Sequence, residues 1–221
     1  MLDLVIAGIL LVLAVPLIVL LAVAIKMDSP GPVFYRCRRV GSFGREFAML
    51  KFRKMWDGAT GPALTTSVDD RLTRLGRFLA ASKLDELPQL WNVIKGEMSL
   101  VGPRPEDPGF VRLAQDEYRE ILKVRPGITG LSQLAFAREG QILDAADRVG
   151  HYLEAIFPQK LGLDSFYASH RSMRMDLRIL VWTARAVFTR RDVAVNRRTG
   201  ELTRRRRVAT AAVQVEQSEY A

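Results

Sequence analysis

Cysteine and histidine are scarce in this sequence of 221 residues. Cys37 is the only cysteine, which excludes an intramolecular disulfide and a zinc site built on cysteines. The two histidines, His151 and His170, argue against a histidine-rich metal site. The low cysteine content fits a reducing compartment.

Negative charge is also in short supply, with 24 Asp and Glu against 33 Lys and Arg and a formal net charge of +9. This excess implies an anionic partner, which is nucleic acid, an acidic membrane face or a phosphorylated substrate. The basic residues are spread over many elements without an aromatic-basic recognition motif, so we expect no nucleic-acid binding. A hydrophobic content of 48% suffices for the core of one domain.

Charge is absent from the segment between Leu4 and Ile25. This run of about 22 residues is long enough to cross a bilayer. It has neither the basic start nor the small-residue cleavage site of a signal peptide. Nearly all Lys and Arg follow Ile25, so we expect a membrane anchor with a cytoplasmic body.

Pro16 interrupts the apolar run near its middle. A proline inside a helix removes a backbone hydrogen bond and produces a kink. Two structures are compatible with this: a kinked span, or a helix that turns at Pro16 and leaves by the face it entered. The apolar pattern alone favours the span.

The remaining sequence predicts a mostly α body with a small β-hairpin, an α+β fold. Residues 33–35 and 47–52 read as strands around a glycine turn at residues 41–44. A final amphipathic helix at residues 173–188 carries several arginines, and it is either an interfacial helix or a core helix with a solvated face. We expect an anchor at residues 1–27, a body at 28–190 and a basic, disordered tail at 191–221.

Asp85 and Glu86 are adjacent carboxylates in a cationic chain. Pro88 predicts that a helix begins near Asp85, which places both carboxylates at the positive end of the helix dipole. Asp85 is then either a simple helix cap or an ionised nucleophile or metal ligand. Arg77 lies close to the pair in sequence and is a candidate phosphate contact.

Several ordered motifs resemble one family. They are Lys51-Phe52-Arg53, Leu84-Asp85-Glu86-Leu87-Pro88-Gln89-Leu90, Asn92 to Glu106 with Val101-Gly102-Pro103-Arg104-Pro105, and Val124-Arg125-Pro126-Gly127-Ile128-Thr129-Gly130. Together they resemble the bacterial sugar transferase family, the monotopic polyprenyl-phosphate phosphoglycosyl transferases, in its small form. The resemblance extends from the apolar anchor to about Phe188.

The resemblance implies a two-step transfer of sugar 1-phosphate from a nucleoside-diphosphate sugar, with UDP expected as the nucleotide, to polyprenyl phosphate. It assigns Asp85 as the nucleophile that forms an aspartyl-phosphosugar, and Glu86 as the contact to Mg²⁺. Together with Arg77, the matching positions give a candidate substrate-binding set of Lys51, Arg53, Arg77, Arg104, Arg125, Asp164 and Asp176. The setting implied is the cytoplasmic face of the bacterial inner membrane, at the start of exopolysaccharide or surface glycan assembly.

The chain departs from the family pattern at several places, among them a segment from Ala137 to Leu163 that is longer than in the smallest members. Val15-Pro16 stands where the family commonly has Ser-Pro, and the resemblance implies a re-entrant anchor that bends at Pro16. Leu131-Ser132-Gln133 stands where the family often has Trp-Ala-Gln, which points to altered sugar selectivity. The competing hypotheses are a membrane-tethered nucleic-acid binder and an anchored scaffold, and neither explains the ordered dyad and arginine loops.

Overall fold

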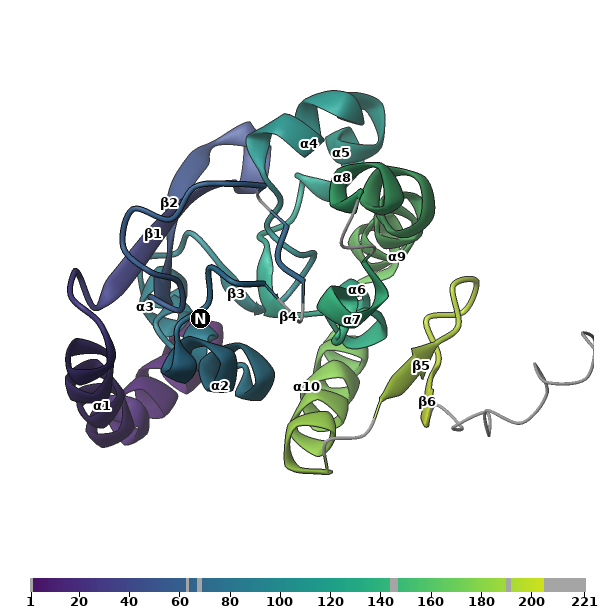
Figure 1. Cartoon of the computed structure of the whole chain (residues 1–221). Helices are drawn as coiled ribbons and strands as arrows, with labels where there is room; N and C mark the ends of the chain where they lie inside the picture. The colour runs from purple at the N-terminus through teal and green to yellow at the C-terminus, as the bar shows by residue number, and fades with distance from the viewer. Residues whose placement is uncertain (1, 63, 67–68, 144–146, 190–191, 205–221) are drawn as a thin grey trace, which may run out of the picture.

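The structure is a computed structural model that describes residues 2–62, 64–66, 69–143, 147–189 and 192–204 (Figure 1). It is mostly helical with small two-stranded sheets, which confirms the predicted class. The longer helices are α1 (Leu2–Asp28), α2 (Arg74–Ser82), α9 (Phe157–His170) and α10 (Met173–Thr189). The shorter ones are α3 (Gln89–Ile94), α4 (Pro108–Leu113), α5 (Gln115–Ile121), α6 (Leu131–Ala135), α7 (Glu139–Ile142) and α8 (Arg148–His151), with single turns η1 (Ser42–Gly44) and η2 (Leu84–Glu86) and a π-helical turn η3 (Tyr152–Ile156).

Helix α1 contains the uncharged run, and the most apolar 18-residue window within residues 3–28 has a mean hydropathy of 3.2. By length and composition it could cross a membrane, and most of its side chains are exposed. It packs against α2, α3 and β3 (Ser99–Val101). Ala7 near its start is fully buried, and Leu21 and Ile25 near its end are buried with Phe52 and Leu79. Helix α1 therefore contacts the rest of the protein near both of its ends.

The predicted hairpin is confirmed. Strand β1 (Phe34–Val40) pairs antiparallel with β2 (Glu46–Phe52), and Phe34 lies opposite Phe52. The turn between the strands carries Phe43 with φ of 57° and Gly44 with φ of 74°, so two consecutive residues adopt the left-handed region. The hairpin extends along the upper left of the molecule and ends beside α3 (Figure 1).

The dyad does not cap a helix, and that prediction is wrong. Asp85 and Glu86 lie in η2, a separate turn entered through Lys83 with φ of 62°. The next helix, α3, has Pro88 at its N-terminal boundary and receives no side-chain cap. Asp85 lies four residues before the first residue of α3, and its ion-pair partner is Lys54, from outside that helix.

Strands β3 and β4 (Gly127–Thr129) form a short parallel pair. The backbone of Gly102 donates to Thr129 O at 2.9 Å, and Gly127 N donates to Pro103 O at 2.8 Å. A Cβ atom at Gly102 or Gly127 would overlap backbone atoms of the opposite segment. These glycines therefore permit the two loops to pack directly against each other.

The C-terminal part begins with α10, which matches the predicted last helix. Strands β5 (Val193–Val195) and β6 (Leu202–Arg204) follow as an antiparallel hairpin beside α6 and α10 (Figure 1). Buried Val193 and Leu202 attach this hairpin to the main core. The predicted disorder from residue 191 onward is thus wrong for residues 193–204, because apolar side chains fasten them. Residues 191 and 205–221 lie outside the described residues.

Candidate active site

Asp85 is the more deeply buried of the two carboxylates, with 1% of the residue exposed. Lys54 Nζ lies 3.1 Å from its Oδ2 atom. Although this is an ion pair, Oδ2 accepts no hydrogen bond of good geometry from the described residues. A buried anionic oxygen that faces one flexible ammonium group is available to attack an electrophile or to bind a cation.

Glu86 lies beside Asp85 and contacts two other cations. Lys51 Nζ is 3.0 Å from Glu86 Oε1, and Arg104 Nη2 is 3.8 Å from the same oxygen. Burial opposes ionisation of this carboxyl, but the charges of Lys51, Arg104 and Lys83 outweigh it and hold the pKa of Glu86 well below its usual range. Glu86 is therefore ionised at neutral pH.

The end of strand β2 decides which cations reach the dyad. Residues 51 and 53 would share one strand face by alternation, but β2 ends at Phe52. The Arg53 guanidinium turns to the linker after α1, where it donates to Pro30 O and, at 2.7 Å, to Ser29 O. Lys54 occupies the place beside Asp85. Sequence reasoning missed Lys54 because the strand terminus is not visible in the pattern.

Asn92 holds the dyad segment against the hairpin. This fully buried side chain accepts from Leu50 N at 3.0 Å and donates to Ala48 O at 2.9 Å, so it pairs with β2 like a strand residue. Its amide also donates to Glu97 Oε2 at 2.7 Å. Asn92 on α3 therefore fixes the distance between the carboxylates of η2 and Lys51 of β2. The sequence signal was a polar residue on the apolar side of a helix.

Arg104 is positioned from below by α9. The backbone N–H of Arg104 donates to Asp164, and Ser132 Oγ donates to Asp164 Oδ1 at 2.6 Å. Asp164 is 4% exposed, and burial raises its pKa to about 7. This buried carboxyl therefore supports the Arg104 loop. Ser132, at the position where the family often has alanine, supplies one of its hydrogen bonds.

A charged network lies behind Arg104 and keeps acidic groups near its guanidinium. Tyr152 donates to Glu106 Oε2 at 2.8 Å, and Lys160 Nζ is 2.7 Å from Glu139 Oε2. Glu86, Glu139 and Glu106 together raise the pKa of Arg104 against the opposing effect of burial. Arg104 therefore remains a permanent cation at the edge of the site.

The other predicted substrate contacts lie apart from the dyad. Arg77 on α2 and Arg125 before β4 are exposed, and neither forms an ion pair with Asp85 or Glu86. Asp176 at the start of α10 accepts from Tyr167 Oη at 2.7 Å, below β3. Thus Lys51 and Arg104 form ion pairs with Glu86 of the dyad, whereas the other members of the predicted set lie apart from it.

The residues present fit a divalent ion that arrives with a diphosphate. Among the described residues no cluster of three His, Cys, Asp or Glu could hold a metal alone. Mg²⁺ is commonly bound by one or two carboxylates together with substrate phosphates and water. The dyad offers two adjacent carboxylates, and the buried Asp85 Oδ2 lacks a good hydrogen bond. This donor set suits Glu86 as a shared ligand and not a preformed metal cage.

Comparison of the sequence with known proteins identifies a family. The family model described as bacterial sugar transferase matches residues 1–190. The chain is 39% identical over 193 residues to a UDP-glucose:undecaprenyl-phosphate glucose-1-phosphate transferase of Caulobacter vibrioides, which covers 85% of this chain and 68% of the relative. A protein of the same name from Xanthomonas campestris is 41% identical over 177 residues, covering 76% and 34%.

A third relative is similar in size to this chain. The exopolysaccharide production protein PSS of Rhizobium leguminosarum is 36% identical over 190 residues, which cover 82% of this chain and 90% of the relative. Several other relatives are longer, and the chain spans only about a third of the Xanthomonas protein. The matched region contains the dyad, its lysines and the Arg104 loop, as the motifs predicted. On these grounds the chain belongs to the bacterial sugar transferase family.

Proposed function

We propose that this protein transfers sugar 1-phosphate from a nucleoside-diphosphate sugar to polyprenyl phosphate in two steps. The observation that carries the proposal is the buried Asp85 carboxylate, held among cations with one oxygen lacking a good hydrogen bond. In the first step Asp85 attacks the β-phosphorus, the bond to the bridging oxygen breaks, and nucleoside monophosphate leaves. In the second step a lipid phosphate oxygen attacks the same phosphorus and releases the Asp85 carboxylate.

The surrounding cations make this attack possible. An anionic nucleophile approaches an anionic phosphate only where positive charge offsets the repulsion, and Lys54, Lys51 and Arg104 supply it. Glu86 would hold Mg²⁺, which when bound withdraws charge from the diphosphate. Lys54 lies on the path to Asp85 Oδ2 and would pass from the carboxylate to the incoming phosphate.

The names of the relatives indicate the class of substrate. Proteins similar to this chain are named for UDP-glucose and for UDP-N-acetylgalactosamine as donors, with undecaprenyl phosphate as acceptor. We infer a UDP-sugar donor and undecaprenyl phosphate acceptor here, at the first step of exopolysaccharide or surface glycan assembly. A panel of nucleotide sugars with purified protein and polyprenyl phosphate, followed by release of nucleoside monophosphate, tests this. No Mg²⁺-dependent release with any donor would favour the nucleic-acid-binding or scaffold hypothesis.

Glu86→Gln is expected to raise the Mg²⁺ concentration that gives the half-maximal rate, and also to lower the maximal rate. The amide keeps the shape of the side chain but is a far weaker ligand for a hard cation. Rates measured across a Mg²⁺ titration check this, with Glu120→Gln on the exposed face of α5 as the control. A titration curve equal to that of the unmodified protein would remove Glu86 from the metal site.

We further propose that α1 is re-entrant, entering and leaving the membrane through the cytoplasmic face with Pro16 at its bend. Ser99 Oγ donates to Asp3 Oδ2 at 2.6 Å, so the first turn of α1 is bonded to β3 within the body. A straight helix of 27 residues is about 40 Å long and would carry Asp3 to the opposite face. A body containing the dyad lies on one side of the bilayer, so this contact supports an anchor that does not cross.

Thiol labelling tests this topology. In a Leu2→Cys, Cys37→Ser protein we expect no reaction with an impermeant thiol reagent added to the periplasmic side of intact cells. Permeabilised cells should label fully and provide the control. Labelling in intact cells would establish a full span and end the re-entrant proposal, while the transfer chemistry would stand.

Helix α10 supports the same membrane orientation. Its exposed apolar side chains recur at helical spacing and include Leu177, Val181 and Phe188, the last 87% exposed. Figure 1 places α1 and α10 along the same lower side of the molecule. We propose that α10 lies in the interface of the inner membrane, on its cytoplasmic face, and keeps the dyad near the depth of a lipid phosphate.

A further inference from the structure

A row of arginines borders the exposed apolar stripe of α10. Arg174, Arg178 and Arg185 follow one another at spacings of four and seven residues, so they lie on one face. Each is one residue beyond Met173, Leu177 or Ala184 of the stripe, so the two rows are adjacent. When the stripe rests in the apolar part of the interface, these arginines lie at the level of the lipid headgroups.

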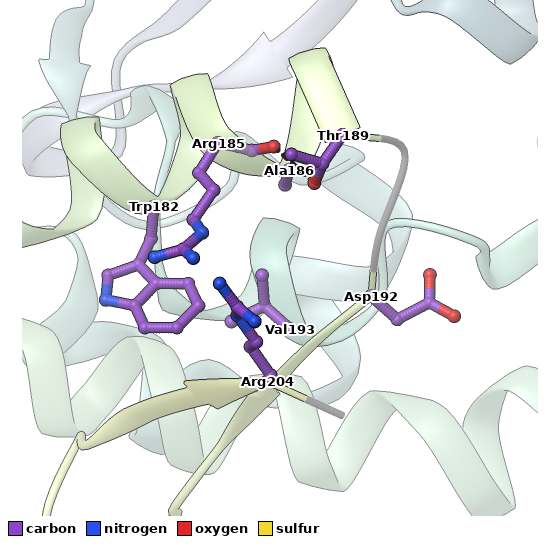
Figure 2. A pocket seen from close by; sticks show the side chains of 7 residues that line it. All are labelled: Trp182, Arg185, Ala186, Thr189, Asp192, Val193 and Arg204. Atoms are coloured by element: carbon purple, nitrogen blue, oxygen red, sulfur yellow. Dashed lines mark hydrogen bonds between the residues drawn. The ribbon is translucent and has the colours of Figure 1, made fainter. Parts of the chain in front are cut away.

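The row ends at a small pocket between α10 and the β5–β6 hairpin. The pocket is lined by Trp182, Arg185, Ala186, Thr189, Asp192, Val193 and Arg204. Figure 2 shows the guanidinium groups of Arg185 and Arg204 extending into the same space beside the Trp182 ring. The Arg185 Cζ atom is 5.5 Å from the centre of that ring. Two cations, one from α10 and one from β6, therefore line the same pocket.

The pocket contains no carboxylate that neutralises this pair. Its one acidic residue, Asp192, points away in Figure 2 and is bound by Arg138 Nε at 2.8 Å. Thr189 Oγ1 donates to the carbonyl of Arg185, so its hydroxyl helps to shape the wall. Within the described residues, neither Arg185 nor Arg204 forms an ion pair with a carboxylate. Converging like charges repel unless an anion lies between them, and the guanidinium fork matches phosphate.

We propose that this pocket binds the phosphate of an anionic lipid headgroup, at a second site separate from the dyad. Arg185 and Arg204 would share the phosphate, and Trp182 would sit at the interface as aromatic residues do in membrane proteins. The apolar stripe sets how deeply α10 lies in the membrane. A headgroup bound between α10 and the β5–β6 hairpin would fix the rotation of α10 about its own axis. The occupant is a lipid because the pocket adjoins the membrane-facing stripe.

The test uses the full chain in nonionic detergent and native mass spectrometry, with short-chain phosphatidate as the probe. A carboxylate lipid of equal charge serves as the comparison. We expect a preference for phosphatidate of about ten-fold, a gain typical of paired charge-assisted hydrogen bonds. Arg185→Gln with Arg204→Gln should abolish the preference. The matched control, Arg174→Gln with Arg178→Gln, removes the same charge from the row outside the pocket and should keep it.

The remaining outcomes each decide against the site. Equal losses in both double variants would show general attraction to negative charge only. A preference that survives in Arg185→Gln, Arg204→Gln and disappears in Arg104→Gln would place the phosphate at the dyad. Displacement of phosphatidate by inorganic phosphate at similar concentration would identify a soluble anion. The proposal builds on membrane association and not on transfer, and nucleoside monophosphate release by the pocket variant in detergent should be unchanged.

Discussion

Replacement of Asp85 by asparagine is expected to leave the protein folded and to lower kcat by a factor of about a thousand or more, the loss typical of a missing nucleophile. The amide retains the shape of the carboxylate but has no charge with which to attack phosphorus. The fold should tolerate the change because Lys54, which loses its counter-ion, is partly exposed and can reach water. Nucleoside monophosphate release and thermal unfolding of the same preparation measure the two effects.

Detection of the covalent intermediate on Asp85 is a second test of the same role. Protein supplied with nucleotide sugar and no lipid acceptor should gain the mass of a phosphosugar in intact-mass spectrometry after rapid quench. Asp85→Asn should gain none. Retention of more than about a tenth of the rate, equivalent to only about 1.4 kcal/mol, would exclude Asp85 as the nucleophile. Turnover that needs both substrates together, without any adduct, would favour direct transfer between them.

Replacement of Lys54 by glutamine is expected to slow the first step about ten- to a thousand-fold, because charge neutralisation by one nearby cation is worth a few kcal/mol at a protein surface. Lys54 is the described cation that forms an ion pair with Asp85. Lys54→Arg keeps the charge and should recover part of the rate. Lys123→Gln, which removes a lysine from an exposed ion pair with Glu120, should have little effect. Single-turnover formation of the adduct isolates this step.

The direction of the change distinguishes two roles for Lys54. If the ammonium only restrains Asp85 in the resting protein, its removal frees the carboxylate and the adduct forms faster. If the ammonium moves with the reaction onto the transferred phosphate, its removal makes formation slower. We expect the slower rate, since the approaching diphosphate brings more negative charge to the site than Asp85 holds there. A faster rate would assign Lys54 to restraint alone.

Local sequence motifs were sufficient for the dyad and for part of its surroundings. Leu84-Asp85-Glu86-Leu87-Pro88 and the Arg104 motif identified residues that the structure brings together, and alternation predicted the β1–β2 hairpin. The motifs failed where a neighbouring element decides the outcome. Arg53 fits the family pattern, yet its guanidinium binds the linker at Ser29, because β2 ends one residue earlier.

Asp164 illustrates the same limit at longer range. Its position in the sequence suggested a polar contact to substrate, while its burial and its bonds to Ser132 and the backbone of Arg104 make it a support for the site. The predicted disordered tail failed for a related reason. Residues 193–204 look polar and basic as a string, but Val193 and Leu202 enter the core supplied by distant helices.

The sequence by itself determined the apolar anchor, the excess of positive charge, the mostly helical class and the acidic dyad, because each depends on composition or on residues close together in the chain. Only the tertiary structure decided that Lys54 pairs with Asp85 and that Asn92 bonds to β2. It also decided that Ser99 bonds to Asp3 and that Arg185 and Arg204 line one pocket. Each of these pairs joins segments separated by many residues. Their contacts depend on where strands and helices end and on how their faces pack, and neither is encoded by local periodicity.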